Sequence, residues 1–352
     1  MSDARHYDLL ETRNPAQREK ALIHALAEQV QHAKSVSPQY ADLLRDIEAP
    51  EISSRAALAL LPLTRKADLV ARQRALPPFG GLARGEGLAR LFISPGPIFE
   101  PEGFEPDDFR FARALFATGI RRGDIMLNCF SYHFTPAGRM LESGATALGA
   151  SVIPAGPGST EQQVLAIARF GVTAYAGTPE FLKTILEKAD EQGSDATSLR
   201  IGHVSGGAFT AALRQFYRAR GLRVRESYAT ADLGVIAYES EAGPIADGGG
   251  LIVDEGVIVE IVRPGTADLV PDGEVGEVVV TPLRESYPLI RFATGDLSAV
   301  LPGLSPCGRT NMRIRGWMGR ADQAVKVKGM FVRPEQVAEI ARRHPELGRM
   351  RL

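Results

Sequence analysis

Hydroxyl, phenol and carboxylate side chains gather in three short segments of the chain, residues 177–178, 205–207 and 228–234. Each segment directly follows a run of apolar or β-branched residues that is typical of a strand. Ligands of parallel α/β sheets bind beyond the carboxyl ends of the strands, because the loops there face one common crevice. We therefore expect these three segments to form a small-molecule site.

Other reactive side chains have ordinary structural explanations. His133 beside two aromatic residues is by itself more often a packing or capping residue than a catalytic one. Lys326 and Lys328 alternate with valines, as residues on the solvent face of a strand do. Cys307 lies in a Ser-Pro-Cys-Gly turn, and the acidic pair 107–108 suits the first turn of a helix. None of these residues indicates a reaction on its own.

Alternating strands and helices position the three segments. From about residue 90 the apolar pattern switches between short β-branched runs and stretches of helical periodicity. The predicted strands are 151–154, 172–177, 200–204 and 223–228, and the predicted helices are 161–170, 179–191 and 209–220. Repeated strand–helix–strand units at this spacing predict a parallel sheet with helices on its faces.

The flanking regions have different patterns. Asn14 and Pro15 form a helix start, and an amphipathic helix is expected to about residue 34. Short β-branched runs at 251–253, 257–262 and 277–283, joined by Asp-Gly turns, predict antiparallel strands. The expected fold class is α/β: parallel sheets flanked by helices, a small antiparallel β subdomain and a short C-terminal α+β segment. The expected domains are 1–245, helical over 1–87, then 246–318 and 319–352.

Composition narrows the classes of function. The 352 residues are 44% apolar and 24% charged, and the net charge of −1 argues against nucleic-acid or anionic-membrane partners. The two cysteines are far apart, which argues against a disulfide framework or a structural zinc site. The densest apolar run, 56–63, is too short to span a bilayer, and no apolar signal core precedes it. We therefore expect a cytoplasmic protein.

Six segments carry a resemblance to a known family. The stretch YPLIRFATGD at 287–296, with PCGRT at 306–310 and GRAD at 319–322, is similar to the nucleotide motifs of the phenylacetate–CoA ligase branch of the adenylate-forming enzymes. Segments 148–154, 170–174 and 199–207 occur in the same order as in that branch. The resemblance covers residues from about 90 to about 340 and implies the fold of the adenylating enzymes, with ATP or AMP as cofactor.

The resemblance implies nucleotide contacts. Asp296 would accept hydrogen bonds from the ribose hydroxyls, and Arg320 would reach the same ribose. Tyr228 would stack on adenine through its ring face. Gly206 and Gly207 would let the backbone approach the base and the acyl group.

It also implies an acyl pocket and a moving C-terminal part. Tyr132, His133 and Phe134 match the family's aromatic acyl-pocket segment and suggest an aromatic carboxylic acid as substrate. Asp322 would be the hinge. Lys326 would face the site in the thioester-forming orientation, as the catalytic lysine of that state.

The phosphate loop departs from the family's pattern, which reads roughly SSGTTGxPKG. This chain reads SPGPIFEPEG at 94–103, so Ser94 and Gly96 remain while Pro97 and Ile98 replace both threonines. Glu102 stands at the position of the lysine. A unit charge about 4 Å from phosphate is worth roughly 4 kcal/mol near a protein surface, so an inward Glu102 would weaken ATP binding strongly.

Two further departures from the family's pattern also concern the phosphate chemistry. After Tyr228, Ala231 lacks the hydroxyl expected for the α-phosphate and Asp232 is a shorter carboxylate for Mg²⁺, although Thr230 could substitute from one position away. Family members normally add a C-terminal domain of about 100 residues. The sequence ends about two dozen residues after Gly329, so the adenylating lysine is expected to be absent and CoA is a doubtful cofactor.

Three hypotheses of function remain open. The first is activation of an aromatic carboxylic acid as its acyl-adenylate, since the chain is similar in plan to shortened relatives of phenazine antibiotic biosynthesis. The second is a non-catalytic protein that binds the aromatic acid, AMP or acyl-adenylate and presents it to a downstream acyl-transfer enzyme. The third is a structural subunit with a residual pocket.

Overall fold

The chain folds around two β-sheets, seen in a computed structural model that describes residues 5–323, 325–327, 330–332, 337, 340, 342–344 and 346. The larger sheet has nine strands in the order β14-β15-β10-β9-β8-β7-β6-β4-β5. Its parallel part consists of β4 (Ile125–Asn128), β5 (Ser151–Pro154), β6 (Ala174–Gly177), β7 (Ile201–Val204) and β8 (Arg223–Thr230). The predicted alternation of strand and helix is therefore confirmed.

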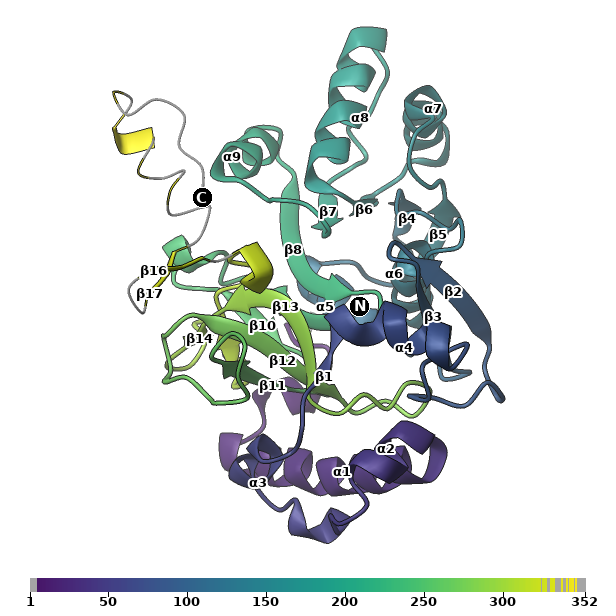
Figure 1. Cartoon of the computed structure of the whole chain (residues 1–352). Coiled ribbons are helices and arrows are strands. Elements are labelled where there is room, and N and C mark those ends of the chain that lie inside the picture. The colour runs from purple at the N-terminus through teal and green to yellow at the C-terminus, as the bar shows by residue number, and fades with distance from the viewer. Residues whose placement is uncertain are drawn as a thin grey trace.

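An antiparallel extension continues this sheet beyond β8. It consists of β9 (Gly234–Glu239), β10 (Leu251–Val253), β15 (Arg313–Ile314) and β14 (Val300–Leu301). Helices cover the larger sheet: α5 (Phe111–Thr118), α6 (Ala137–Ala147), α7 (Thr160–Phe170), α8 (Pro179–Gln192) and α9 (Ala211–Ala219). Figure 1 shows α7, α8 and α9 at the top, on the side of the parallel strands.

Local chemistry accounts for the ends of α8. Thr178 caps its start by accepting a hydrogen bond from the Phe181 backbone N–H, and Pro179 occupies the first turn. Gly193 ends the helix in the left-handed conformation. These signals lie in the sequence itself, and the observed helix exceeds the predicted one by a single residue.

The smaller sheet has four strands in the order β1-β13-β12-β11. They are β1 (Thr64–Arg65), β13 (Phe292–Ser298), β12 (Gly276–Pro282) and β11 (Val257–Val262). The long helix α1 (Pro15–Val36) packs against this sheet, because Leu22, Leu26 and Val30 share one buried cluster with the valines of β11 and β12. Figure 1 shows α1, α2 (Pro38–Leu43) and α3 (Arg55–Ala59) together at the bottom of the molecule.

Two strand pairs and one short helix complete the part that surrounds the site. The hairpin β2 (Arg90–Ser94) and β3 (Ile98–Glu102) lies beside α4 (Leu69–Ala75), and β16 (Val325–Val327) pairs with β17 (Met330–Val332). The strands that the sequence grouped at 246–318 divide between both sheets. The expected α/β class with parallel and antiparallel parts is confirmed, while the division into three domains remains a proposal.

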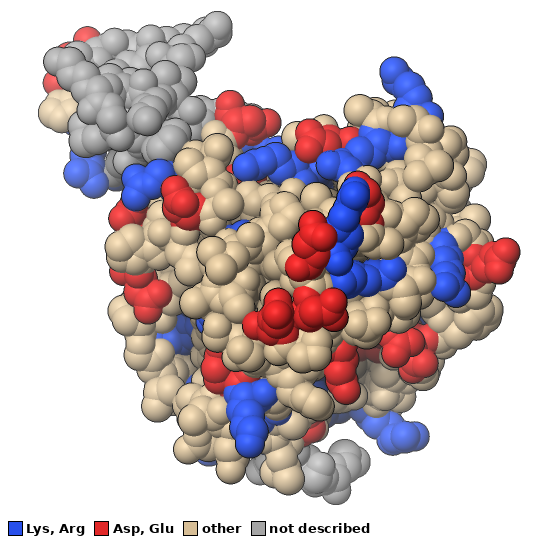
Figure 2. Space-filling view, turned by 60° about the horizontal axis from the view of Figure 1, so that its bottom comes forward, with Lys and Arg blue, Asp and Glu red and all other residues tan. Residues whose placement is uncertain are grey.

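The surface is mixed in charge. Figure 2 shows acidic and basic side chains interspersed over the face it draws, with uncharged surface between them. In the described part of the chain, no helix combines the length and the apolar character needed to cross a bilayer.

Candidate functional site

Asp296 of β13 is the centre of the first cluster at the site. Its Oδ2 accepts a hydrogen bond from the Tyr228 hydroxyl at 2.9 Å, and its Oδ1 accepts from Trp317 Nε1–H at 3.2 Å and from an Arg320 N–H at 3.3 Å. Thr294 Oγ1 accepts from the Asp296 backbone N–H at 3.1 Å. The structure therefore brings together Tyr228, Asp296 and Arg320, three residues predicted at one nucleotide site from segments far apart in the sequence.

Arg320 lies across the backbone of β13. Gly295 has a φ of +78°, which favours glycine, and a Cβ there would come within 2.7 Å of the Arg320 guanidinium and displace it. The same guanidinium donates to the Thr294 carbonyl and to the Asp322 carboxylate, each at 3.3 Å. Asp322, the predicted hinge, is exposed in the short helix 321–323.

Tyr228 is buried at the end of β8, with 7% of its surface exposed. Burial, followed by the nearby Asp296 charge, raises the pKa of its hydroxyl well above the usual value. The phenol therefore stays protonated and donates to Asp296. Adenine stacking by its ring remains a prediction.

The predicted phosphate loop is a tight hairpin. Ser94 pairs directly with Ile98, so only Pro95, Gly96 and Pro97 form the turn between β2 and β3. Gln73 of α4 fixes the hairpin by exchanging two hydrogen bonds with the Phe99 backbone, at 2.8 and 2.9 Å. A turn of this size, with two prolines, leaves few backbone N–H groups to cradle phosphate.

Glu102 lies at the far end of β3, away from the turn. It faces Arg90 across the hairpin, and its carboxylate accepts from Arg90 at 3.3 Å and from Arg139 at 3.0 Å. Its side chain is 2% exposed. Two arginines neutralise this carboxylate, so the strong loss of ATP binding that was expected from an inward Glu102 does not apply. The acidic residue nearest the turn is Glu100.

Glu100 and Asp232 form a second cluster with Ser94 and Lys66, in which both acids and the serine are buried and the lysine is partly exposed. Ser94 Oγ donates to Glu100 Oε1, and Lys66 Nζ donates to Asp232 Oδ2 at 2.6 Å. Neither Glu100 Oε2 nor Asp232 Oδ1 has a hydrogen-bond partner among the described residues. Burial, reinforced by the Asp232 charge, raises the pKa of Glu100 to about 8. Glu100 is therefore neutral at pH 7.

This second cluster does not fit a resident Mg²⁺ ion. Asp232, the predicted metal ligand, offers one free oxygen, and the Lys66 ammonium group on its other oxygen would repel the ion. No set of three or more His, Cys, Asp or Glu side chains in the described ranges could hold a metal ion. Thr230 Oγ1 accepts from the Leu233 backbone N–H at 3.2 Å and supports the turn.

The predicted acyl-pocket segment points in two directions. Tyr132 turns inward, where its hydroxyl accepts from Asn128 Nδ2 at 2.8 Å. His133 and Phe134 are exposed and pack edge to face, with ring centroids 4.7 Å apart. The Phe134 carbonyl accepts from the Ile93 backbone N–H at 2.9 Å, which ties the segment to β2.

The two predicted glycines after β7 have different neighbours. Gly206 has a φ of +69°, and a Cβ there would lie 3.9 Å from the Phe130 ring, which places an aromatic side chain near this loop. A Cβ on Gly207 would lie 2.9 Å from a Glu180 carboxylate oxygen. The positive φ favours glycine at position 206, whereas at 207 an added Cβ would only require the Glu180 side chain to move.

Lys326 lies in β16, and its side chain is outside the described residues. Its predicted catalytic role therefore remains a prediction.

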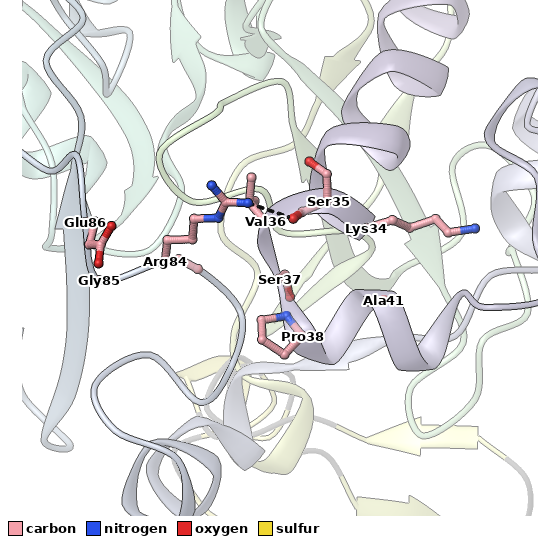
Figure 3. Close-up of a pocket in the computed structure, with 10 residues that line it drawn as sticks. Lys34, Ser35, Val36, Ser37, Pro38, Ala41, Arg84, Gly85 and Glu86 are labelled. Carbon is pink, nitrogen blue, oxygen red and sulfur yellow. Dashed lines mark hydrogen bonds between the residues drawn. The ribbon is translucent and has the colours of Figure 1, made fainter.

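A separate cavity of about 680 Å³ lies between the end of α1 and the loop that contains Arg84 (Figure 3). Its two basic residues already bind backbone carbonyls: Arg84 donates to Ser35 at 3.0 Å and Lys34 to Ile47 at 2.5 Å. The cavity contains none of the predicted site residues, and its satisfied cations give it no evident chemistry.

Four residues of the site were missed from the sequence: Lys66, Glu100, Phe130 and Trp317. Trp317 comes just before the Gly-Arg-Ala-Asp motif, and that position could have identified it. Glu100 was missed because the ungapped comparison of the loop drew attention to Glu102. Lys66 lies far from the motifs, and only the fold brings it to the site. Phe130 lies two residues before the predicted acyl-pocket segment 132–134, and that position could have identified it.

Comparisons with known proteins agree with this geometry. The profile of the AMP-binding enzyme family matches residues 109–282. The chain is 31% identical to the phenylacetate–coenzyme A ligase of Aromatoleum evansii over 90% of this chain and 74% of that protein. It is 32% identical to the enzyme of Thermus thermophilus over 82% of this chain and 67% of that protein.

Solved structures show the same fold. A 2-hydroxyisobutyryl-CoA ligase in the postadenylation state, in complex with 2-HIB-AMP, superimposes with a TM-score of 0.85 at 25% identity, over 96% of this chain and 75% of that one. An anthranilate CoA ligase in complex with anthranoyl-AMP gives a TM-score of 0.56 at 18% identity, over 92% and 76%.

These matches decide the family and correct one expectation. The expectation that CoA is a doubtful cofactor is not borne out, because the similar proteins are named CoA ligases. The identity and coverage, with the shared fold and the Asp296 cluster, lead to one conclusion: the chain belongs to the phenylacetate–CoA ligase family of AMP-binding, adenylate-forming enzymes.

Proposed function

We propose that this chain binds an aromatic carboxylic acid joined to AMP as an acyl-adenylate, and that it binds this ligand better than ATP. The observation that carries the proposal is the Asp296 cluster, which retains the carboxylate, guanidinium and phenol expected to contact a nucleoside. The Tyr132 ring and the Phe130 ring near Gly206 support an aromatic acyl group.

The β2–β3 hairpin supports the second half of the proposal. ATP adds two phosphates to AMP, and these need backbone N–H groups and cations. The hairpin turn offers Pro95, Gly96 and Pro97, and the cluster below it contains two acids, Glu100 and Asp232, against one lysine. With Glu100 neutral at pH 7 and Lys66 bound to Asp232, the cluster offers the two added phosphates no uncommitted cation. AMP does not need these contacts.

A second candidate function is ATP-dependent formation of the adenylate. Family membership favours it, as does the match of residues 109–282 to AMP-binding enzymes. Catalysis would then rest on holding the carboxylate in line with the α-phosphate, which is a matter of position more than of acid–base chemistry. Lys326 would serve a later thioester step with CoA.

The proposal includes a partner. An acyl-adenylate is a reactive mixed anhydride, so a protein that retains it protects it from water until an acyl-transfer enzyme accepts the acyl group. A place in aromatic antibiotic biosynthesis, suggested by the similarity in plan to the phenazine-pathway relatives, belongs to the same proposal.

ATP–pyrophosphate exchange with a panel of aromatic acids separates the two candidates. The proposed function predicts that calorimetry detects binding of AMP and of an aromatic acid such as phenylacetate, and that exchange stays at background. Hexanoate is the matched control, because it has the carboxylate and a similar number of carbons without the ring. Exchange that depends on the aromatic acid would establish adenylate formation instead.

A further inference from the structure

Asp296 has almost no hydrogen-bonding capacity left for a ligand. An ionised carboxylate offers about four acceptor positions. Three are taken by the Tyr228 hydroxyl, Trp317 Nε1–H and an Arg320 N–H. A ribose presents a 2′,3′-diol, which brings two hydroxyl donors. One of the three protein donors must therefore leave before both hydroxyls can bind.

Trp317 is the donor that leaves at the lowest cost. Tyr228 is 7% exposed and also contacts Thr294, and Arg320 is held by the Thr294 carbonyl and by Asp322. Trp317 is 53% exposed, and Asp296 is its only hydrogen-bond partner among the described residues. Its indole is neutral, so its hydrogen bond to the carboxylate is weaker than that of the guanidinium. After the indole N–H leaves Asp296, water can accept its hydrogen bond.

The backbone on both sides of Trp317 stays in place during this exchange. The Arg315 N–H donates to the Ala299 carbonyl at 3.0 Å, and the Met318 N–H donates to the Leu297 carbonyl at 2.9 Å. The indole can therefore rotate away from Asp296 without any movement of β13.

We propose that Trp317 is an internal competitor for the ribose-binding carboxylate, and that a nucleotide with two ribose hydroxyls displaces its indole N–H from Asp296. This inference rests on the proposed function, because it assumes that Asp296 binds ribose. It assigns to Trp317 a role in positioning and selecting the nucleotide. A 2′-deoxynucleotide, which brings one hydroxyl, fits the single vacant acceptor position and leaves Trp317 in place.

The test compares AMP with 2′-deoxy-AMP in two proteins. In the Trp317→Phe variant the ring remains but the competing N–H is gone, so AMP should bind roughly fivefold tighter by calorimetry. The affinity for 2′-deoxy-AMP should stay unchanged. Leu304→Ala is the matched control, because it removes an exposed apolar side chain outside the site and should change neither affinity.

The unmodified protein gives an independent readout, because Trp317 is its only tryptophan. Saturating AMP should shift the indole fluorescence to longer wavelength as the ring enters water, and saturating 2′-deoxy-AMP should not. Equal AMP affinity in both proteins with unchanged fluorescence would overturn the competitor role and leave the proposed function intact. If neither nucleotide binds either protein, both proposals are overturned.

Discussion

The two clusters that we propose to face the two halves of a nucleotide differ in their hydrogen bonding and charge. In the Asp296 cluster (Tyr228, Thr294, Asp296, Trp317 and Arg320), both carboxylate oxygens are hydrogen-bonded and a cation balances the charge. In the Glu100 cluster (Lys66, Ser94, Glu100 and Asp232), two buried acids share one lysine, and two carboxylate oxygens have no hydrogen-bond partner in the described part of the chain.

The two clusters differ in the ligand groups that they can bind, hydroxyl groups in one case and phosphate groups in the other. The Asp296 cluster can exchange a neutral donor for the hydroxyls of a ligand at little cost. The Glu100 cluster offers a phosphate no uncommitted cation, because Lys66 is already bound to Asp232, and above pH 8 the ionised Glu100 adds a repelling charge. Under the proposed function, nucleoside recognition and triphosphate recognition are therefore separable.

The largest expected effect is the loss of nucleotide affinity when Asp296 is replaced. Asp296→Ala removes the acceptor for both ribose hydroxyls, and hydrogen bonds to a charged group contribute about 1.5–3 kcal/mol each. We expect AMP affinity measured by calorimetry to fall by roughly 100-fold. Asp272→Ala, at an exposed turn, is the control. Unchanged AMP affinity would show that Asp296 does not bind the ribose.

The next effect concerns the stability of the Glu100 cluster. Lys66→Met leaves Asp232 buried without its counter-charge, and the side chain of Lys66 is 27% exposed, so we expect a loss of about 2 kcal/mol in the free energy of unfolding. Denaturant titration measures it. The double variant with Asp232→Asn should recover most of the loss. An equal loss in the double variant would show that Lys66 stabilises through packing alone.

Glu100 predicts a pH dependence of stability. Its pKa is raised to about 8 in the folded protein by burial and by Asp232, whereas the unfolded chain has the ordinary value. The unfolded state therefore loses this proton first, and stability should fall as pH rises from about 4.5 to about 8, by up to about 1.4 kcal/mol per pH unit. In Glu100→Gln this contribution should vanish. A parallel pH profile in the two proteins would contradict the neutral Glu100.

The smallest effect separates the two glutamates of β3. Glu102 is paired with Arg90 and Arg139 away from the turn, so Glu102→Gln should change ATP affinity by less than about twofold. Glu100→Gln should raise ATP affinity above pH 8, where the native carboxyl is ionised. Calorimetry at pH 9 compares the two variants. A larger gain in ATP affinity from Glu102→Gln than from Glu100→Gln would show that Glu102 lies near the phosphates.

The sequence predicted most of the fold because the signals were local. Thr178, Pro179 and Gly193 define α8 through short-range hydrogen bonds and backbone preferences. The antiparallel extension of the large sheet was not predicted as part of that sheet, because β10 pairs with β9 on one side and with β15, some sixty residues further along, on the other. Such pairing depends on the whole fold and leaves no local pattern.

The residues of the site, like the strands, were predictable from the sequence only where the signal was local. Motifs near residues 228, 296 and 320 identified the residues that the structure brings together. The β2–β3 hairpin was not predicted, because Pro95, Gly96 and Pro97 were compared with a phosphate loop and not recognised as a turn signal. The partners of Glu100 come from β2, from the loop after β8 and from the segment before α4, so only the folded chain reveals them.

The affinities of AMP and ATP for the unmodified protein, measured by calorimetry at one pH with and without Mg²⁺, test the separation of the two clusters most directly. The account predicts that AMP binds at least as tightly as ATP and that Mg²⁺ changes neither affinity. ATP that binds tenfold or more tightly than AMP, with a gain from Mg²⁺, would show that the hairpin and the Glu100 cluster still hold the triphosphate.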